Sequence, residues 1–217
     1  MATASKPLLS PAVKADAEMF GYTRQDLFRM NKMKASRTAM QLHSVLGQLI
    51  ATLRPGGKVL RVLDIGSGNS AVRASFLKRN YAQYVDIFDS TEIGWNFDPK
   101  HHVLTKALID NNMTYDFVLC HGVVECQATA PQLNKLCAIL AQLTSGWGYC
   151  LVSYCTTTDR MTKANAPLAK TTVYASLSRS FNNVWAAQKV NSRNVRHGDW
   201  GSAVGMNELW ICNKMEI

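Results

Sequence analysis

The stretch Val62–Ser70, VLDIGSGNS, determines the fold that we expect for this chain. It begins with the apolar residues of a buried strand and ends in a loop where Gly66 and Gly68 permit a tight turn. Such a turn after a parallel strand is typical of nucleotide-binding α/β sheets, because a ligand can approach the backbone closely there. The stretch therefore predicts a ligand site at the carboxyl end of the first strand.

Strands and helices alternate on both sides of this stretch. The expected strands are Lys58–Ile65, Tyr84–Phe88, His102–Thr105, Asp116–Cys120, Gly148–Tyr154, Val184–Val190 and Glu208–Asn213. The expected helices are Leu42–Leu53, Ala71–Lys78, Pro131–Leu143 and 168–180. No helix fits between the last two strands, so they form an antiparallel hairpin. The pattern predicts a doubly wound α/β fold with a mostly parallel, seven-stranded sheet, a reversed last strand and helices on both faces.

Length and composition limit the classes of protein to which this chain can belong. The 217 residues fit one domain, which we place at 37–217 after a basic N-terminal extension, 1–36, whose first twenty residues read as a loose arm. Hydrophobic residues make up 47% of the chain and charged residues 18%, as in globular proteins. No apolar run approaches the roughly 20 residues that span a bilayer, and the start makes a poor signal peptide. We therefore expect a soluble, cytoplasmic protein, in the host cytoplasm if it is viral.

The six cysteines have no paired CxxC spacing. Most lie in or beside apolar segments, which predicts buried thiols that pack as small hydrophobic side chains. Cys120, His121 and Cys126 have the wrong spacing for a zinc knuckle. We therefore expect no metal site.

The net charge of +9 is unevenly distributed. Residues 1–61 hold ten Lys/Arg against three Asp/Glu, 62–158 six against eight, and 159–217 eight against four. Basic flanks attract polyanions, although a generally basic, solvated surface would give the same composition. The expected RNA-binding residues are Arg24, Arg29, Lys32, Lys34, Arg37, Arg193, Arg196 and Trp200.

Charge near the glycine loop indicates the kind of cofactor. Asp89 follows the second strand, where a carboxylate can accept the ribose hydroxyls of an adenosine, and Asp110 is the expected contact for the adenine edge. The loop reads DxGxG and lacks the third glycine of dinucleotide-binding loops. Asp64 suits a sulfonium and an amino group better than a pyrophosphate. The expected cofactor-binding residues are Asp64, Ile65, Gly66, Ser67, Gly68, Asp89, Ser90, Asp110, Cys120 and His121.

These motifs resemble those of the class I S-adenosylmethionine-dependent methyltransferase superfamily over residues 37–214. VLDIGSGNS resembles its first motif, VDIFDS its second, and YDFVLCHGVVE its fourth strand with the turn that follows. The resemblance implies a Rossmann-like fold, S-adenosyl-L-methionine as cofactor and methyl transfer as the activity. It leaves the substrate open.

One subfamily of this superfamily, the ribose 2′-O-methyltransferases of ribosomal RNA and viral caps, carries a Lys-Asp-Lys-Glu tetrad. SRTAMQL, Ser36–Leu42, resembles their first segment but places Gln41 at the lysine. His121 stands at the aspartate and Ser153 at the second lysine, and only Glu208 matches. Either the enzyme is not of this type, or another lysine replaces Gln41. A guanine-N7 acceptor needs no base, so the mismatch favours N7 methylation of an RNA cap.

Other readings stay open. His121 and Glu208 are the catalytic candidates, and either can equally be an ordinary loop or edge-strand residue. Lys32 or Lys34 can take the place of Gln41 if the register of the first segment differs. The alternative activities are a small-molecule or protein methyltransferase and a non-catalytic RNA-binding scaffold with the same fold. An activating protein partner can also supply residues that this chain lacks.

Overall fold

The computed structural model describes residues 11–27, 40–53, 60–68, 70–91, 95, 98–155, 168–191 and 206–216. Its strands are β1 (Arg61–Ile65), β2 (Tyr84–Phe88), β3 (Tyr115–His121), β4 (Thr144–Cys155), β5 (Asn183–Asn191) and β6 (Met206–Asn213). Its helices are α1 (Pro11–Met19), α3 (Met40–Leu53), α4 (Ala71–Lys78), α6 (Thr105–Asp110), η1 (Val124–Cys126), α7 (Ala130–Leu143) and α8 (Lys170–Ser178). No helix in these ranges is long and apolar enough to cross a membrane.

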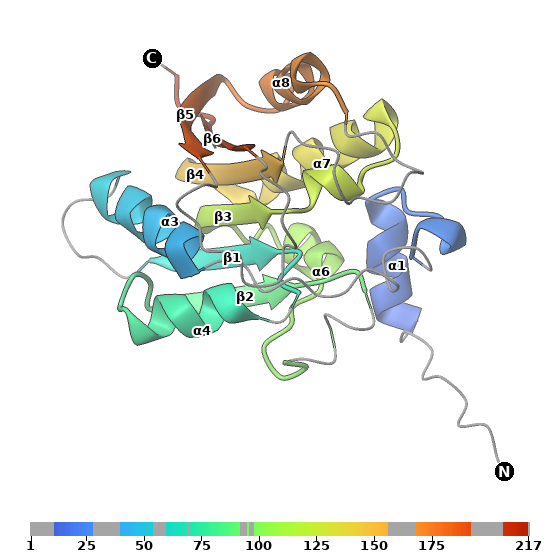
Figure 1. The fold of residues 1–217 in the computed structure, drawn as a ribbon. Coiled ribbons are helices and arrows are strands. Elements are labelled where there is room, and N and C mark those ends of the chain that lie inside the picture. The colour runs from blue at the N-terminus through green and yellow to red at the C-terminus, as the bar shows by residue number, and fades with distance from the viewer. Residues whose placement is uncertain are drawn as a thin grey trace, which may run out of the picture.

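The strands form one six-stranded sheet in the order β2-β1-β3-β4-β6-β5 (Figure 1). β2, β1, β3 and β4 are parallel, and β6 runs antiparallel to both of its neighbours, β4 and β5. The reversed last strand is therefore confirmed. Because the four parallel strands point the same way, the loops after β1, β2 and β3 meet at one edge of the sheet, which we call the carboxyl edge.

Alternating side chains divide the core into two layers. Leu63 and Ile65 of β1 pack with α6, α7 and α8 on one face, whereas Val62 packs with α3 and α4 on the other. On α7, Leu133, Leu136, Leu140 and Leu143 recur at helical spacing and all are fully buried. Full burial of a leucine side chain contributes about 1.5–3 kcal/mol, so α7 anchors the first layer.

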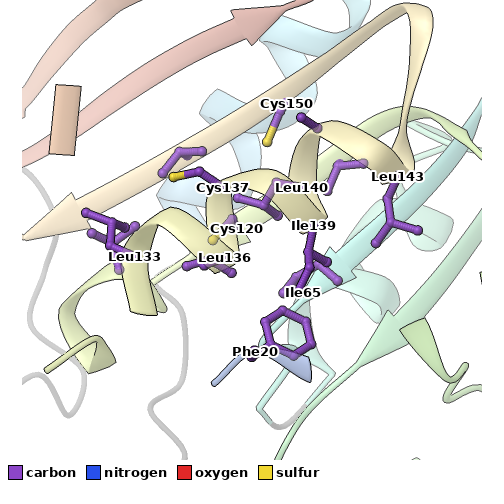
Figure 2. Packing of buried hydrophobic residues seen from close by; sticks show 14 of the residues in the cluster. Phe20, Ile65, Cys120, Leu133, Leu136, Cys137, Ile139, Leu140, Leu143 and Cys150 are labelled. Carbon is purple, nitrogen blue, oxygen red and sulfur yellow. The ribbon is translucent and has the colours of Figure 1, made fainter. Parts of the chain in front are cut away.

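Four cysteines belong to the α7 layer, as predicted for buried thiols. Cys120, Cys137, Cys150 and Cys212 are at most 1% exposed, and Figure 2 shows the first three among leucine side chains. Burial raises the pKa of the Cys137 thiol to about 12 and that of Cys150 well above its ordinary value. These thiols stay protonated at neutral pH and act as small apolar groups.

The loose arm predicted for the first twenty residues is wrong from residue 11 onward. Pro11 opens α1, where a fixed φ suits the first helical turn. Val13, Ala17 and Phe20 are buried at the spacing i, i+4, i+7, and two of them join the α7 core layer. Burial of this face holds the segment on the domain. The predicted boundary at residue 36 lies outside the described residues.

The third of the seven predicted strands, His102–Thr105, is also wrong, because only one bridge forms there, between Ile87 and His102. Thr105 instead begins α6. The carboxylate of Asp16 accepts hydrogen bonds from the backbone N–H groups of Thr105 and Lys106, which would otherwise lack partners at a helix start. A contact across 89 residues of sequence therefore replaces the strand by a helix.

Gly148 of β4 is required by packing, which predicts a stability loss on substitution. A β-carbon there would lie 2.7 Å from the carbonyl oxygen of Asp116 and 2.8 Å from that of Tyr115, both backbone atoms. We expect Gly148→Ala to lower the free energy of unfolding by about 1–3 kcal/mol in urea titrations. Gly146→Ala is the control, since nothing lies within 4 Å of its β-carbon position. Equal stability of the two variants would contradict this packing argument.

Candidate cofactor site

The glycine loop after β1 has left-handed backbone at both glycines and at Ser70, which has φ +56°. Gly66 has φ +79° and Gly68 φ +52°. The backbone N–H groups of Gly66 and Ser67 donate to the carbonyl oxygen of Phe88, at 2.8 and 3.0 Å. A β-carbon on Gly66 would lie 2.2 Å from a methyl group of Val123, whereas no described residue other than the chain neighbours lies within 4 Å of that position on Gly68. Gly66 therefore serves packing, and Gly68 borders open space.

Asp89, the residue after β2, fastens this loop. Its carboxylate is buried, and Oδ2 accepts the backbone N–H of Gly68 at 2.8 Å. Oδ1 accepts the backbone N–H of Thr91 at 2.7 Å and its hydroxyl at 2.6 Å. A carboxylate has about four acceptor positions, so about one remains for another donor. Asp89 thus has a structural duty besides the predicted one toward a ribose.

Asp64 lies on β1 directly before the loop and is 2% exposed. Burial first, and then the charge of Asp89, raise the pKa of Asp64 to about 7. Its Oδ2 has no hydrogen-bond partner within the described residues, and neither do the hydroxyl oxygens of Ser67 and Ser70. Buried polar atoms without partners are unfavourable, so this group of oxygens is suited to a ligand that brings donors or positive charge.

His121 and Ser153 lie at the carboxyl ends of neighbouring strands. They are register partners of β3 and β4, and Nδ1 of His121 is hydrogen-bonded to Oγ of Ser153. Ser153 is 1% exposed, while His121 is half-buried. Glu208 lies opposite Tyr154 on β6, one position further along, and its side chain is outside the described residues. The backbone thus brings both catalytic candidates to the carboxyl edge.

The remaining expected cofactor residues are divided between this edge and other places. Ser90 is half-buried next to Asp89, whereas Ile65 and Cys120 belong to the hydrophobic core. Asp110 is the last residue of α6 and pairs with Lys106 at 2.8 Å, with both side chains 56% exposed. α6 leads into the start of β3, so Asp110 lies toward the opposite edge of the sheet. The geometry does not bring it to the loop.

The structure adds aromatic residues that the sequence reasoning missed. The ring of Phe20 stacks on that of Phe88 with centroids 5.3 Å apart. The hydroxyl of Tyr22 accepts a hydrogen bond from Nε2 of Gln127, which follows β3, at 2.8 Å. The sequence feature that indicates this packing is the apolar spacing of Val13, Ala17 and Phe20, which predicts a packed helix face.

Of the expected RNA-binding residues, Arg24 is described, and its side chain is exposed. The following lie outside the described residues: Arg29, Lys32, Lys34, Arg37, Arg193, Arg196 and Trp200. Within the described part of the chain, no three His, Cys, Asp or Glu side chains are placed to hold a metal ion.

Comparison with known proteins shows the fold. No family model matches the sequence, and no curated protein does. Among solved structures, N-methyltransferase NodS from Bradyrhizobium japonicum WM9 aligns with a TM-score of 0.58 and 13% identity, over 81% of this chain and 96% of that one. The fold is that of SAM-dependent methyltransferases.

Two further structures support this assignment. A SAM-dependent methyltransferase from Leishmania major aligns with a TM-score of 0.58 and 12% identity, over 94% of this chain and 87% of that one. Magnesium protoporphyrin IX methyltransferase (ChlM) from Synechocystis PCC 6803, solved with bound SAM, aligns with a TM-score of 0.52 and 15% identity, over 98% and 100%. Identities this low establish the fold alone.

The raised pKa of Asp64 predicts a pH-dependent effect of its substitution. The folded state keeps the Asp64 proton up to pH about 7, while the unfolded state releases it near pH 3.8. The free energy of unfolding therefore falls as pH rises between these values, and ionised Asp64 is most unfavourable above pH 7. We expect Asp64→Asn to raise the melting temperature of the ligand-free protein more at pH 8 than at pH 5. The corresponding difference in the free energy of unfolding is on the order of 2 kcal/mol.

Ser67→Ala is the matched control for this measurement, because it removes an unpartnered oxygen from the same loop and no titratable group. Its effect on the melting temperature should be the same at both pH values. An equal gain for Asp64→Asn at pH 5 and pH 8 would exclude a raised pKa at Asp64.

Proposed function

We propose that this protein is a SAM-dependent methyltransferase with its methyl donor bound over Gly66–Gly68. The observation that carries the proposal is the set of buried, unpartnered oxygens of Asp64, Ser67 and Ser70 around a loop that is open at Gly68. When bound, S-adenosylmethionine supplies an electrophilic methyl group on a sulfonium. Asp64 fits the positive charge of such a ligand, and the fourth acceptor position of Asp89 fits a ribose hydroxyl.

The proposed acceptor is RNA, with guanine-N7 of a cap preferred over a ribose 2′-oxygen. A ribose hydroxyl must lose its proton, for which the 2′-O enzymes use charged side chains. At the matching positions this chain has His121 and Ser153, which bond to each other at neighbouring strand ends. N7 offers its own lone pair, so the residues need only position it. The net charge of +9 supports a polyanionic partner.

We propose that His121 and Glu208 lie beside the methyl acceptor. Ser153 fixes the ring of His121 at the carboxyl edge through the Nδ1 bond, so the ring can orient an acceptor without serving as its base. Glu208 reaches the same edge from β6. The proposed location of the protein is the cytoplasm, where capped mRNA is translated.

A small-molecule acceptor is the second candidate. Of two proteins of similar fold, one is named as an N-methyltransferase and the other as a magnesium protoporphyrin IX methyltransferase, and the second name contains that of a small molecule. This chain covers 96% and 100% of their lengths, so it resembles them in size as well as in fold. An amine acceptor would also need little help from a base.

Substitution of Gly68 tests the cofactor site. Alanine at φ +52° is strained, which lowers the free energy of unfolding by about 1 kcal/mol, and its methyl group enters the open space of the loop. We expect Gly68→Ala to bind S-adenosylhomocysteine about tenfold or more weakly in isothermal titration. Gly146→Ala, an exposed glycine on β4, should bind as wild type does. No binding by the wild type at millimolar ligand would refute the proposed function.

Methyl transfer onto capped RNA tests the acceptor. With labelled donor, we expect label on GpppA- and GpppG-capped RNA at guanine-N7, and none on the uncapped RNA of the same sequence. RNA binding should weaken as salt rises, because phosphate contacts release counterions. Label on ribose would contradict the N7 assignment. Cofactor binding with no transfer to any RNA, but with transfer to small amines, would favour the second candidate.

A further inference from the structure

Asp16 of α1 joins the N-terminal segment to the start of α6. Its carboxylate is 1% exposed, and Oδ2 accepts the hydroxyl of Thr105 at 2.7 Å. Oδ1 accepts the backbone N–H of Lys106 at 3.0 Å, and Oδ2 also accepts that of Thr105. A buried carboxylate with three donors at a helix start is a firm attachment. One end of the segment is therefore fixed to α6.

The other end of the segment is fixed to α7. Nε2 of Gln132 donates to the carbonyl oxygen of Gly21 at 3.2 Å and to Oδ2 of Asp26 at 3.0 Å. Asp26 in turn accepts the backbone N–H and the hydroxyl of Thr23, at 2.9 and 2.7 Å. The segment between Asp16 and Asp26 is thus tied at both ends to helices of the same sheet face.

Between these ties the segment crosses the carboxyl edge. Phe20 stacks on Phe88, the last residue of β2, and Tyr22 bonds to Gln127, which follows β3. β1 lies between β2 and β3 in the sheet. A segment that contacts the end of β2 and the loop after β3 therefore lies beside the end of β1, where the glycine loop begins. Figure 1 shows α1 beyond the arrowheads of β1, β2 and β3.

The surroundings of Tyr22 contain a further unpartnered acceptor. Nε2 of Gln127 donates to Tyr22 and to the carbonyl oxygen of Val123, at 2.8 and 2.9 Å. A carbonyl only accepts, so this contact fixes which end of the amide is nitrogen. Oε1 of Gln127, a residue 2% exposed, then has no partner in the described part of the chain. Unpartnered oxygens thus occur in the loops after both β1 and β3, the strands that the segment crosses.

We infer that Asp16 is a positioning residue, which holds Phe20 and Tyr22 in place as the outer wall of the cofactor site. Through this attachment the segment excludes water from Gln127 and retains the bound ligand. Exchange of the ligand then requires the segment to lift from the carboxyl edge. The inference rests on the proposed function, because the ligand that probes it is the demethylated donor.

Limited trypsin digestion of the wild-type chain tests the wall directly. The bonds after Lys14 and Arg24, both exposed, lie in the segment, and the bond after Arg179 at the end of α8 is the internal control. We expect saturating S-adenosylhomocysteine to slow cleavage after Lys14 and Arg24 about tenfold or more, and cleavage after Arg179 to stay constant. Mass spectrometry of the early fragments gives each rate.

Variants at the two ends of α6 separate attachment from general stability. Asp16→Ala removes all three accepted bonds, and Asp16→Asn retains part of them. We expect faster cleavage after Lys14 and Arg24 without ligand, and S-adenosylhomocysteine affinity about tenfold or more weaker in Asp16→Ala, with Asp16→Asn between it and wild type. Asn111→Ser, an exposed residue at the other end of the same helix, should match wild type in both measurements.

The outcomes of the digestion and binding experiments distinguish this inference from the proposed function. Binding by the wild type without slower cleavage in the segment overturns this inference and leaves the proposed function standing. Faster cleavage in Asp16→Ala at unchanged affinity reduces Asp16 to a purely structural role and also overturns it. No binding by the wild type overturns both. If Asp16→Ala does not fold, as judged by circular dichroism, the wild-type digestion decides alone.

Discussion

The hydrogen bonds that fasten the glycine loop to the end of β2 are the constraint on which the site depends. The carbonyl oxygen of Phe88 accepts two backbone N–H groups of the loop, and Asp89 accepts a third, from Gly68. These bonds satisfy donors that a turn with left-handed residues removes from the regular sheet pattern. They hold the loop open at Gly68, and they bring Asp89 close enough for its charge to act on Asp64.

This arrangement places unfavourable charge in the ligand-free protein. Asp64 is buried, and both its burial and the charge of Asp89 oppose its ionisation. A positively charged ligand relieves both effects, because it replaces lost solvation and offsets the repulsion between the carboxylates. Stability of the empty fold and affinity for such a ligand are therefore opposed at Asp64. The same reasoning separates this loop from a dinucleotide site, where a pyrophosphate would add a third negative group.

Local sequence patterns correctly predicted those elements that depend on neighbouring residues in the chain. The bounds of β2 and α4 match the expected ones residue for residue, and the reversed last strand followed from the short spacing before it. The predictions failed where distant contacts decide. Asp16 converts an expected strand at Thr105 into a helix start, and this contact spans 89 residues. Spacing along the chain also placed Asp110 near the loop, because it does not tell which edge of a sheet a helix end reaches.

Some site residues likewise follow from local sequence, and others depend on contacts between distant elements. Gly66, Gly68 and Asp89 could be read from the sequence, because their roles follow from a turn between consecutive elements. The bond between His121 and Ser153 depends on β3 and β4 being neighbours in register, which the sequence does not specify. That bond constrains the chemistry. A serine hydroxyl carries no charge, so Ser153 cannot stabilise an alkoxide as a lysine ammonium at this position would. The proposed guanine-N7 acceptor rests on this difference, because N7 brings its own lone pair and needs no lysine at this position.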